Sequence, residues 1–304
     1  MTLNQAIRGN ILALITIIIW GTTFISTKII LEDFSPIEIL FCRFTLGIFV
    51  LFIIYPHKFK TKGFQEEKYI ILAGLTGVLL YYLLENIALT MTTASNVAIL
   101  GSISPFFTAI LARLLFKTEK ASLSFYIGFV MAIIGIIIVS LNGTQDIEIN
   151  PFGDIIAIIS AFVWALYSNI TRNISTFGYN TILTTRRSFL YGLIFMVPVL
   201  FIADTSFDTV RFMNPVNWGN LLFLGVGASA ICFLTWNTAI KYIGAVKTSV
   251  YIYFGPIITL ITSIVILKEK ITFLLIIGII FIVFGLLISE KKLHCTSNKN
   301  GTLK

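Results

Sequence analysis

Two ionisable residues lie inside long apolar runs, where they could bind a charged ligand or exchange a proton. Arg43 falls within residues 36–55 and Glu85 within residues 69–90. A charged side chain at the bilayer centre costs about 2.5–3.5 kcal/mol on insertion scales, so each needs a compensating role. At about 1.5 Å per helical residue, both would lie at a similar depth, on the order of 10 Å. We expect either an Arg43–Glu85 ion pair that fixes two helices together or a role for Glu85 in cation binding or proton coupling.

Glu85 belongs to a polar face of its helix. Tyr82, Glu85 and Asn86 share that face because they follow one another at i, i+3 and i+4. A later run places Trp236 and Asn237 with the same spacing after an aromatic residue. An amide on such a face is expected to contact either a substrate or a neighbouring helix, and both alternatives remain open here.

Two tryptophans, Trp20 and Trp164, lie near the middle of their apolar runs, away from the membrane interfaces where Trp is usually enriched. An indole ring can stack on a flat or cationic ligand, and ordinary helix packing is the alternative. An aromatic cavity suited to apolar or aromatic substrates would comprise Trp20, Tyr82, Trp164, Tyr167, Trp236 and Tyr253.

Prolines interrupt two further apolar runs, Pro105 within 94–116 and Pro256 within 244–267. Proline lacks a backbone donor and clashes with the carbonyl four residues earlier, so Gly101 and Ile252 should have free carbonyls. We expect a hinge or a fixed bend near the middle of each run, with Ser102 beside the first as a candidate substrate-binding residue.

The composition requires a membrane to hold these elements. Hydrophobic residues make up 57% of the chain and charged residues 12%, against about 25% charged in globular domains. Runs of roughly 20 apolar residues can each cross a bilayer as a helix. They contain no alternation of apolar and polar residues, so a β-barrel is not expected. Ten spans are predicted, at 10–31, 36–55, 69–90, 94–116, 122–141, 152–172, 179–203, 217–240, 244–267 and 272–289.

The net charge of +8 is interpreted as topology, and no nucleic-acid partner is expected. Basic residues such as Lys58, Lys60 and Lys62 gather in loops on one side, whereas the opposite loops carry acids such as Glu32 and Asp146. Because basic loops stay in the cytoplasm, both termini should be cytoplasmic, in a bacterial cytoplasmic (plasma) membrane.

The sequence repeats itself. At one constant spacing Trp20 corresponds to Trp164 and Arg43 to Arg187, and at a slightly longer one Pro105 corresponds to Pro256. We predict one copy over 1–145, a second over 146–290 and a cytoplasmic tail over 291–304. Five spans per copy is an odd number, so the second copy must be inverted, as in many secondary transporters. The predicted fold is an all-α membrane protein with ten transmembrane helices in two inverted-topology five-helix repeats.

The copies differ where charge is concerned. Arg187 corresponds to Arg43, but Trp236 stands where the first copy has Glu85. The second copy therefore lacks the acid, and Arg186 and Arg187 need other partners. Their long side chains are expected to extend towards the cytoplasmic surface, and recognition of a substrate carboxylate is the alternative.

The duplicated pattern resembles the EamA-type exporters of the drug/metabolite transporter superfamily over about residues 9–290. The resemblance rests on paired tryptophans, prolines and glutamates and on glycines in the fifth and tenth spans: Trp20, Trp164, Pro105, Pro256, Glu119, Glu269, Gly128, Gly135, Gly278 and Gly285. It implies a ten-helix exporter of amino acids, related metabolites or hydrophobic cations. Its cavity would be lined mainly by the first, third and fourth helices of each copy.

We therefore expect a secondary transporter that exports small amino-acid-like, aromatic or cationic metabolites by alternating access, driven by the substrate gradient or by proton exchange. A sugar-nucleotide or lipid-precursor carrier is one alternative. A non-transporting membrane partner protein or a membrane-embedded enzyme is the other. Enzymatic activity, a metal and a cofactor are not expected, because no nucleophile, base or metal-ligand cluster converges. The expected partners are a small-molecule substrate and the lipid bilayer, and the chain is expected to be a monomer or a homodimer.

Overall fold

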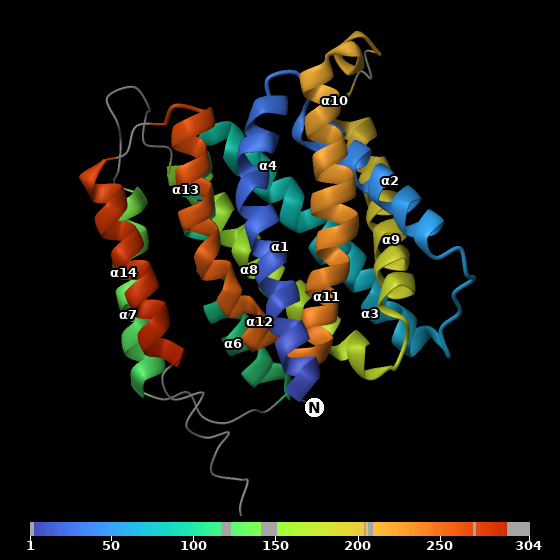
Figure 1. Cartoon of the computed structure of the whole chain (residues 1–304), viewed down its shortest axis with the longest axis horizontal. Helices are drawn as coiled ribbons and strands as arrows, with labels where there is room; N and C mark the ends of the chain where they lie inside the picture. Colours follow the sequence, from blue (N-terminus) through green and yellow to red (C-terminus); the bar gives the residue numbers. More distant parts are fainter. Residues whose placement is uncertain are drawn as a thin grey trace, which may run out of the picture.

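The computed structural model describes residues 3–116, 123–140, 151–203, 205, 209–269 and 272–290, and every regular element in these ranges is a helix (Figure 1). Glu119 and the predicted tail over 291–304 lie outside the described residues. The first copy comprises α1 (Leu3–Ile30), α2 (Pro36–Ile54), α3 (Phe64–Ala73), the π-helix η1 (Gly74–Leu80), α4 (Tyr81–Met91), α5 (Ala94–Gly101), α6 (Ser104–Phe116) and α7 (Leu123–Ser140).

The second copy has the same order of α- and π-helices and two additional 3-10 helices. It comprises α8 (Pro151–Thr176), α9 (Thr181–Ile202), the 3-10 helix η2 (Thr209–Met213), α10 (Pro215–Leu222), the π-helix η3 (Phe223–Ile231), α11 (Cys232–Ile243), α12 (Ala245–Ser249), the 3-10 helix η4 (Val250–Phe254), α13 (Gly255–Ile266) and α14 (Phe273–Glu290).

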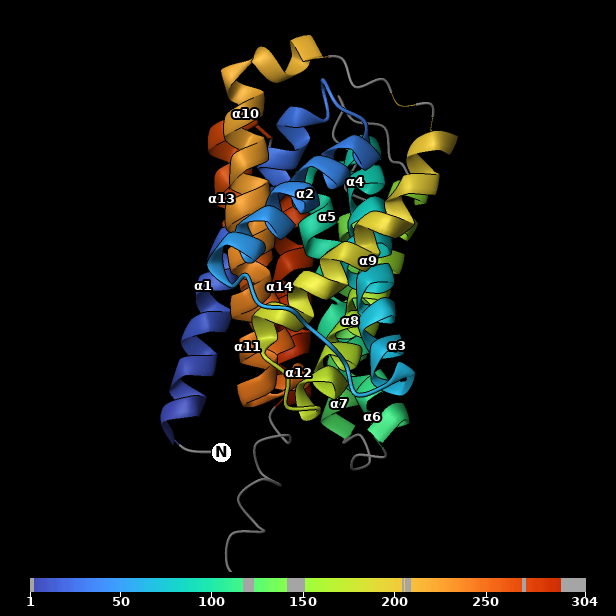
Figure 2. The same ribbon diagram turned by 90° about the vertical axis from the view of Figure 1, so that its right-hand side faces the viewer.

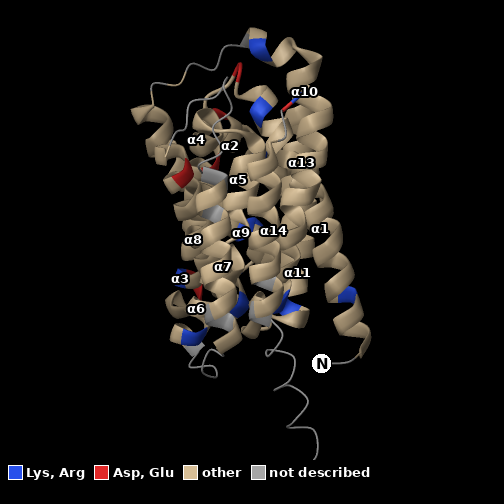
Figure 3. Cartoon of the chain, turned by 90° about the vertical axis from the view of Figure 1, so that its left-hand side faces the viewer, with Lys and Arg blue, Asp and Glu red and all other residues tan. Residues whose placement is uncertain are grey.

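These helices confirm the predicted all-α membrane fold. Among the described residues, eight continuous helical stretches are long and apolar enough to cross a membrane. They coincide with eight of the predicted spans, and α7 and α14 occupy the other two. The charged residues lie mainly towards the two ends of the helices, and most of the middle of the bundle carries none (Figure 3).

Polar side chains start several helices at the predicted places. The backbone N–H of Ser35 donates to Glu38 at 2.8 Å, and Pro36 opens α2. The side chains of Asn180 and Asn214 accept from the backbone N–H two residues later, at 2.8 and 3.0 Å, and start α9 and α10. Such caps satisfy amide groups that the first helical turn leaves without partners.

The second helices of the two copies run in opposite directions. Arg211, which follows α9, pairs with Glu38 at the start of α2 at 3.0 Å. Arg186, near the start of α9, donates to the carbonyl of Tyr55 just after α2 at 2.8 Å. Each helix therefore begins where the other ends, as an inverted repeat requires (Figure 2).

The third helix of each copy contains a π-helical stretch that the sequence pattern gives no sign of. Here Tyr81 N–H donates to the carbonyl of Thr76 and Cys232 N–H to that of Gly227, five residues back in each case. Glycine permits close packing at this point, because a methyl group at Gly74 would lie 2.6 Å from the Ser188 carbonyl oxygen. The wider turns thus lie where the third helices press against their neighbours.

The fourth helices break where the prolines predict. The first is interrupted at Ser102, between α5 and α6, and the other passes through η4 before Pro256 opens α13. The carbonyl of Ile252 is not free as expected, because Gly255 N–H donates to it across a 3-10 turn. The tighter turn satisfies the acceptor that proline would otherwise leave without a donor.

Helices α7 and α14 pack side by side at one edge of the bundle (Figure 1). A methyl group at Gly135 would lie 2.7 Å from the carbonyl oxygen of Gly278, and one at Gly285 would lie 2.5 Å from that of Gly128. The glycines therefore bring the two backbones into contact, which is how helices associate where lipid offers no hydrophobic drive.

Candidate functional site

A cavity lies in the middle of the bundle, between helices of both copies. It encloses about 580 Å³ of space, part of it open to the outside. We call it the central cavity. Its lining residues are Ile17, Trp20, Gly21, Thr23, Phe24, Tyr81, Tyr82, Glu85, Ala98, Gly101, Ser104, Ala161, Trp164, Ile252, Gly255 and Pro256.

Aromatic rings form one wall of the central cavity. Trp20 and Trp164 meet edge to face at 5.1 Å between centroids, and Tyr81 lies 4.7 Å from Trp164. The Trp20 indole N–H donates to the carbonyl of Ala228 in η3 at 2.9 Å. Edge-to-face pairs and this hydrogen bond hold the rings in fixed orientations. The wall is therefore a preformed surface for a flat or cationic group.

Glu85 is the only charged residue among those that line the central cavity. Its side chain is buried, and the hydroxyl of Tyr81, one turn earlier on the same helix, donates to its carboxylate. A carboxylate in low-dielectric surroundings attracts a cation more strongly than it would in water. The cavity thus offers one negative group beside aromatic faces.

Arg43 does not form the predicted ion pair with Glu85: no salt bridge joins these two described residues. Arg43 is fully buried, its Nε donates to Ser229 Oγ at 2.9 Å, and its guanidinium carbon lies 4.2 Å from the centroid of the Tyr82 ring. The face of an aromatic ring therefore stabilises the Arg43 charge, while the Tyr81 hydroxyl donates a hydrogen bond to the Glu85 carboxylate. Within the described part of the chain, the two terminal nitrogens of Arg43 have no hydrogen-bond partner.

Five of the predicted residues line the central cavity: Trp20, Tyr82, Glu85, Trp164 and Pro256. Pro105 does not line it, but its neighbour Ser104 does. The fourth-helix breaks therefore lie at the cavity, as expected from their mid-span positions.

Other predicted residues have packing roles. Asn86 donates to the carbonyl of Pro36 at 3.3 Å, and Ser102 donates to that of Ile99 at 2.5 Å. Trp236 is fully buried behind Trp20, with 5.1 Å between their rings. Tyr253 is buried and directly follows Ile252, which lines the central cavity.

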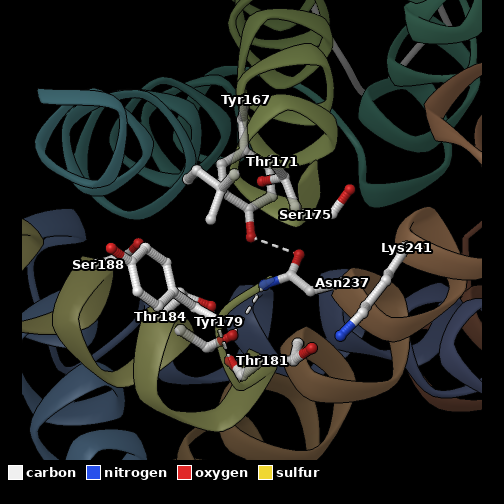
Figure 4. A pocket seen from close by; sticks show the side chains of 11 residues that line it. Tyr167, Thr171, Ser175, Tyr179, Thr181, Thr184, Ser188, Asn237 and Lys241 are labelled. Atoms are coloured by element: carbon white, nitrogen blue, oxygen red, sulfur yellow. Dashed lines mark hydrogen bonds between the residues drawn. The ribbon is translucent and has the colours of Figure 1, made fainter. Parts of the chain in front are cut away.

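Tyr167 and Asn237 line a second pocket between the end of α8, the start of α9 and the end of α11 (Figure 4). Its space of about 380 Å³ is partly open to the outside. The Tyr167 hydroxyl donates to Asn237 Oδ1 at 2.8 Å, and Asn237 Nδ2 donates to Thr185 Oγ1 at 3.0 Å. We call this the hydroxyl pocket. Its lining residues are Tyr167, Thr171, Ile174, Ser175, Tyr179, Thr181, Thr184, Thr185, Ser188, Asn237 and Lys241.

The model of the EamA-like transporter family matches residues 7–141 and again residues 151–290. The chain belongs to the EamA-like transporter family. It is a multi-pass integral membrane protein and a membrane transporter.

Several relatives of this family member cover most of its length. An uncharacterized transporter of Archaeoglobus fulgidus is 27% identical over 94% of this chain and 99% of its own. The uncharacterized transporter YyaM of Bacillus subtilis is 29% identical over 88% of each chain. A protein of known crystal structure has the same fold, with a TM-score of 0.68 at 17% identity over 96% of this chain and 99% of that one.

In this EamA-like protein the second-copy arginines have partners that the repeat alignment did not indicate. Arg187 pairs with Glu67 at 2.9 Å. Arg187 therefore has the other partner that the sequence required, and that acid comes from the first copy. Arg186 donates to the backbone carbonyls of Tyr55 and His57, in line with a side chain that extends to the end of its helix.

A carboxylate joins two helical segments at the bundle end opposite the N-terminus. Glu269 accepts from the backbone N–H of Ala94 at 3.0 Å and from the Ser95 hydroxyl, which also contacts Ser263 Oγ at 2.8 Å. Lys28 donates to the carbonyl of Thr92 at 2.9 Å. The start of α5 is thereby joined to the segment after α13.

Some cavity residues could have been found from the sequence. Tyr81 lies four residues before Glu85, a helical spacing that places it beside the carboxylate. Gly101 and Gly255 line the cavity because the helices break at the prolines that follow them. Phe24 and Ala161 have no such signal, since nothing in an all-apolar run shows which side faces a cavity.

Proposed function

We propose that the central cavity binds small aromatic or cationic metabolites, amines and amino-acid-like compounds among them, and exports them by alternating access. The observation that carries this is the lone carboxylate of Glu85 against the wall formed by Trp20, Trp164 and Tyr81. An ammonium group over an aromatic face gains about 0.5–2 kcal/mol, more when water is excluded.

Alternating access would use the inverted copies, 1–145 and 146–290. The contact between Glu269 and the start of α5 would close one end of the bundle, so that the cavity would reach that side only when this contact breaks. Flexing or rigid reorientation at Ser104 and Gly255, which border the cavity, would redirect the opening. With both termini in the cytoplasm, the closed end faces outward and transport is export across the cytoplasmic membrane.

Coupling to protons follows from the single charge in the cavity. A proton and a cationic substrate would compete for the Glu85 carboxylate, because no second charged residue is present in the lining. Their exclusive binding would exchange one for the other across the membrane.

The test is reconstitution of the full chain into liposomes with a panel of labelled amines, amino acids and cationic aromatic dyes. We expect saturable flux of cationic or aromatic compounds and its loss in Glu85→Gln. Trp20→Ala and Trp164→Ala should weaken substrate affinity. Glu32→Gln, which neutralises an exposed loop carboxylate, is the matched control. Full transport with unchanged pH dependence in Glu85→Gln would disprove a role of Glu85 in proton exchange and in cation binding.

The alternative cargoes and classes have less support. A sugar nucleotide or lipid precursor would require basic groups in the cavity, whereas none of its lining residues is Lys or Arg. Enzymatic chemistry would require groups beside Glu85 that the lining does not offer. A monomeric or homodimeric assembly and the absence of a nucleic-acid partner stay predictions.

A further inference from the structure

The hydroxyl pocket is separate from the central cavity and is formed by one copy only. All its lining residues belong to the second copy, at the end of the bundle that holds the N-terminus. The position follows from α11, whose last residue Ile243 contacts Gly9 near the start of α1. Tyr167 stands between the two spaces, with its hydroxyl in the pocket and its ring 4.9 Å from that of Trp164.

The repeat shows that the fold does not require this pocket. At the spacing that relates Arg43 to Arg187, four lining residues of α9 correspond to apolar residues of α2: Thr181 to Ile37, Thr184 to Leu40, Thr185 to Phe41 and Ser188 to Phe44. The four positions follow at i, i+3, i+4 and i+7, so one whole helix face has changed from apolar to hydroxyl-bearing.

The first copy packs the equivalent face solidly. Ile37, Leu40 and Phe44 are buried in the hydrophobic core there. Apolar residues at these sites therefore suit the architecture. Thr and Ser at these sites replace the apolar groups of the first copy with hydroxyl groups, which makes the lining of the pocket suited to a polar ligand.

One hydroxyl of the pocket lacks a partner among the lining residues. Ser188 is buried, yet its hydroxyl forms no hydrogen bond with them (Figure 4), whereas the Thr184 hydroxyl donates to the backbone carbonyl of Thr181 at 3.1 Å. Ile174 is the only apolar side chain among the eleven that line the space. Thr184 and Thr185 are buried beside it with their side chains on the same face.

The pocket carries a single positive charge. Lys241 is its only charged lining residue, and it makes no ion pair with any described residue. Figure 4 shows its ammonium group turned towards Thr181 and Asn237. Hydroxyl and amide groups can both donate and accept, whereas the ammonium group only donates. This set matches a molecule with several hydroxyl groups and one anionic group.

We infer that the hydroxyl pocket is a second binding site, for a small hydroxylated metabolite that carries one carboxylate. Lys241 binds the carboxylate, and the Thr and Ser side chains of α9 bind the hydroxyl groups. The site does not depend on the cargo of the central cavity, because it shares no lining residue with it.

The experiment measures binding of labelled gluconate, a polyhydroxylated monoanion, to the purified full chain in lipid nanodiscs. Sorbitol, of the same length but uncharged, is the ligand control. Gluconate should bind saturably and more tightly than sorbitol. Lys241→Gln should weaken gluconate binding by on the order of tenfold, as expected for one charge-assisted hydrogen bond. Lys247→Gln, an exposed lysine on α12 outside the pocket, should leave it unchanged.

A second variant tests the pocket itself. Thr184→Leu introduces the first-copy residue and fills the space, so gluconate binding should be lost. Retained binding of a cationic dye to the central cavity would show that this variant is folded. Absence of saturable gluconate binding to the unmodified chain, or equal losses in Lys241→Gln and Lys247→Gln, would overturn the assignment.

Discussion

The central cavity and the hydroxyl pocket lie within one bundle but have opposite chemistry. The first has aromatic walls, residues from both copies and one carboxylate. The second has hydroxyl-bearing walls, residues from one copy and one ammonium group. The difference teaches that duplication supplies the architecture of this protein, whereas divergence between the copies supplies its chemistry. The central cavity takes Trp20 and Trp164 from corresponding positions of the two copies, whereas Glu85 and the hydroxyl-bearing face of the second pocket stand where the copies differ.

The largest expected effect is a reciprocal loss. Glu85→Gln should weaken binding of an aromatic cation by on the order of 100-fold, since a buried charged contact is removed, and should leave gluconate binding intact. Lys241→Gln should do the reverse. Equilibrium binding of both probes to both variants measures this, and parallel losses in either variant would contradict two separate sites.

Gly77→Ala should damage both sites together. A methyl group there would lie 2.1 Å from the ring of Tyr167, which separates the two spaces. Displacing this ring should lower the free energy of unfolding by about 1–3 kcal/mol, as overpacking does, and weaken both probes. Thermal unfolding in detergent gives the first value. Gly219→Ala is the control, because nothing lies within 4 Å of its new methyl group.

Arg43→Met should strengthen cation binding to the central cavity and leave gluconate binding to the hydroxyl pocket unchanged. It removes a buried positive charge behind Tyr82, so cation binding should strengthen several-fold as a like charge disappears. Replacement of a buried charge by an apolar side chain is often neutral or stabilising by about 1–4 kcal/mol. Arg43→Lys, which keeps the charge, should keep the original affinity, and weaker cation binding in Arg43→Met would refute the prediction.

The smallest effect is expected for Arg187→Met, at the position that corresponds to Arg43. Its pair with Glu67 is partly exposed, with 38% of the Arg187 side chain accessible, and such pairs contribute about 0.2–1 kcal/mol. The melting temperature should fall slightly while both probes bind normally. A loss of either probe would show that the contact between the copies shapes a cavity.

The sequence predicts the spans, the inverted duplication and the breaks before Pro105 and Pro256 because each has a local physical cause. It does not predict the directions of Arg43 and Glu85 around their helix axes, so the expected ion pair is wrong. The partner Glu67 was missed because it precedes the predicted span that begins at residue 69. The π-helices could not be predicted, because the sequence pattern of an apolar run does not distinguish a π-helix from an α-helix.

The hydroxyl pocket has a signal in the sequence, carried by residues that are neither charged nor aromatic. Thr181, Thr184, Thr185 and Ser188 stand at helical spacing in the printed sequence. Their meaning emerges only from comparison with the first copy. A polar helix face alone could equally face water or a neighbouring helix.

The pairing of α7 with α14 has a kinematic consequence. One of these helices ends each copy, and their backbones touch at Gly135 and Gly285, which leaves little room for sliding between them. If the copies move as rigid bodies, this line of contact is the part that can be displaced least. The two halves would then rotate about this line of contact, and the largest displacements would occur at the far edge of the bundle, around α2 and α9.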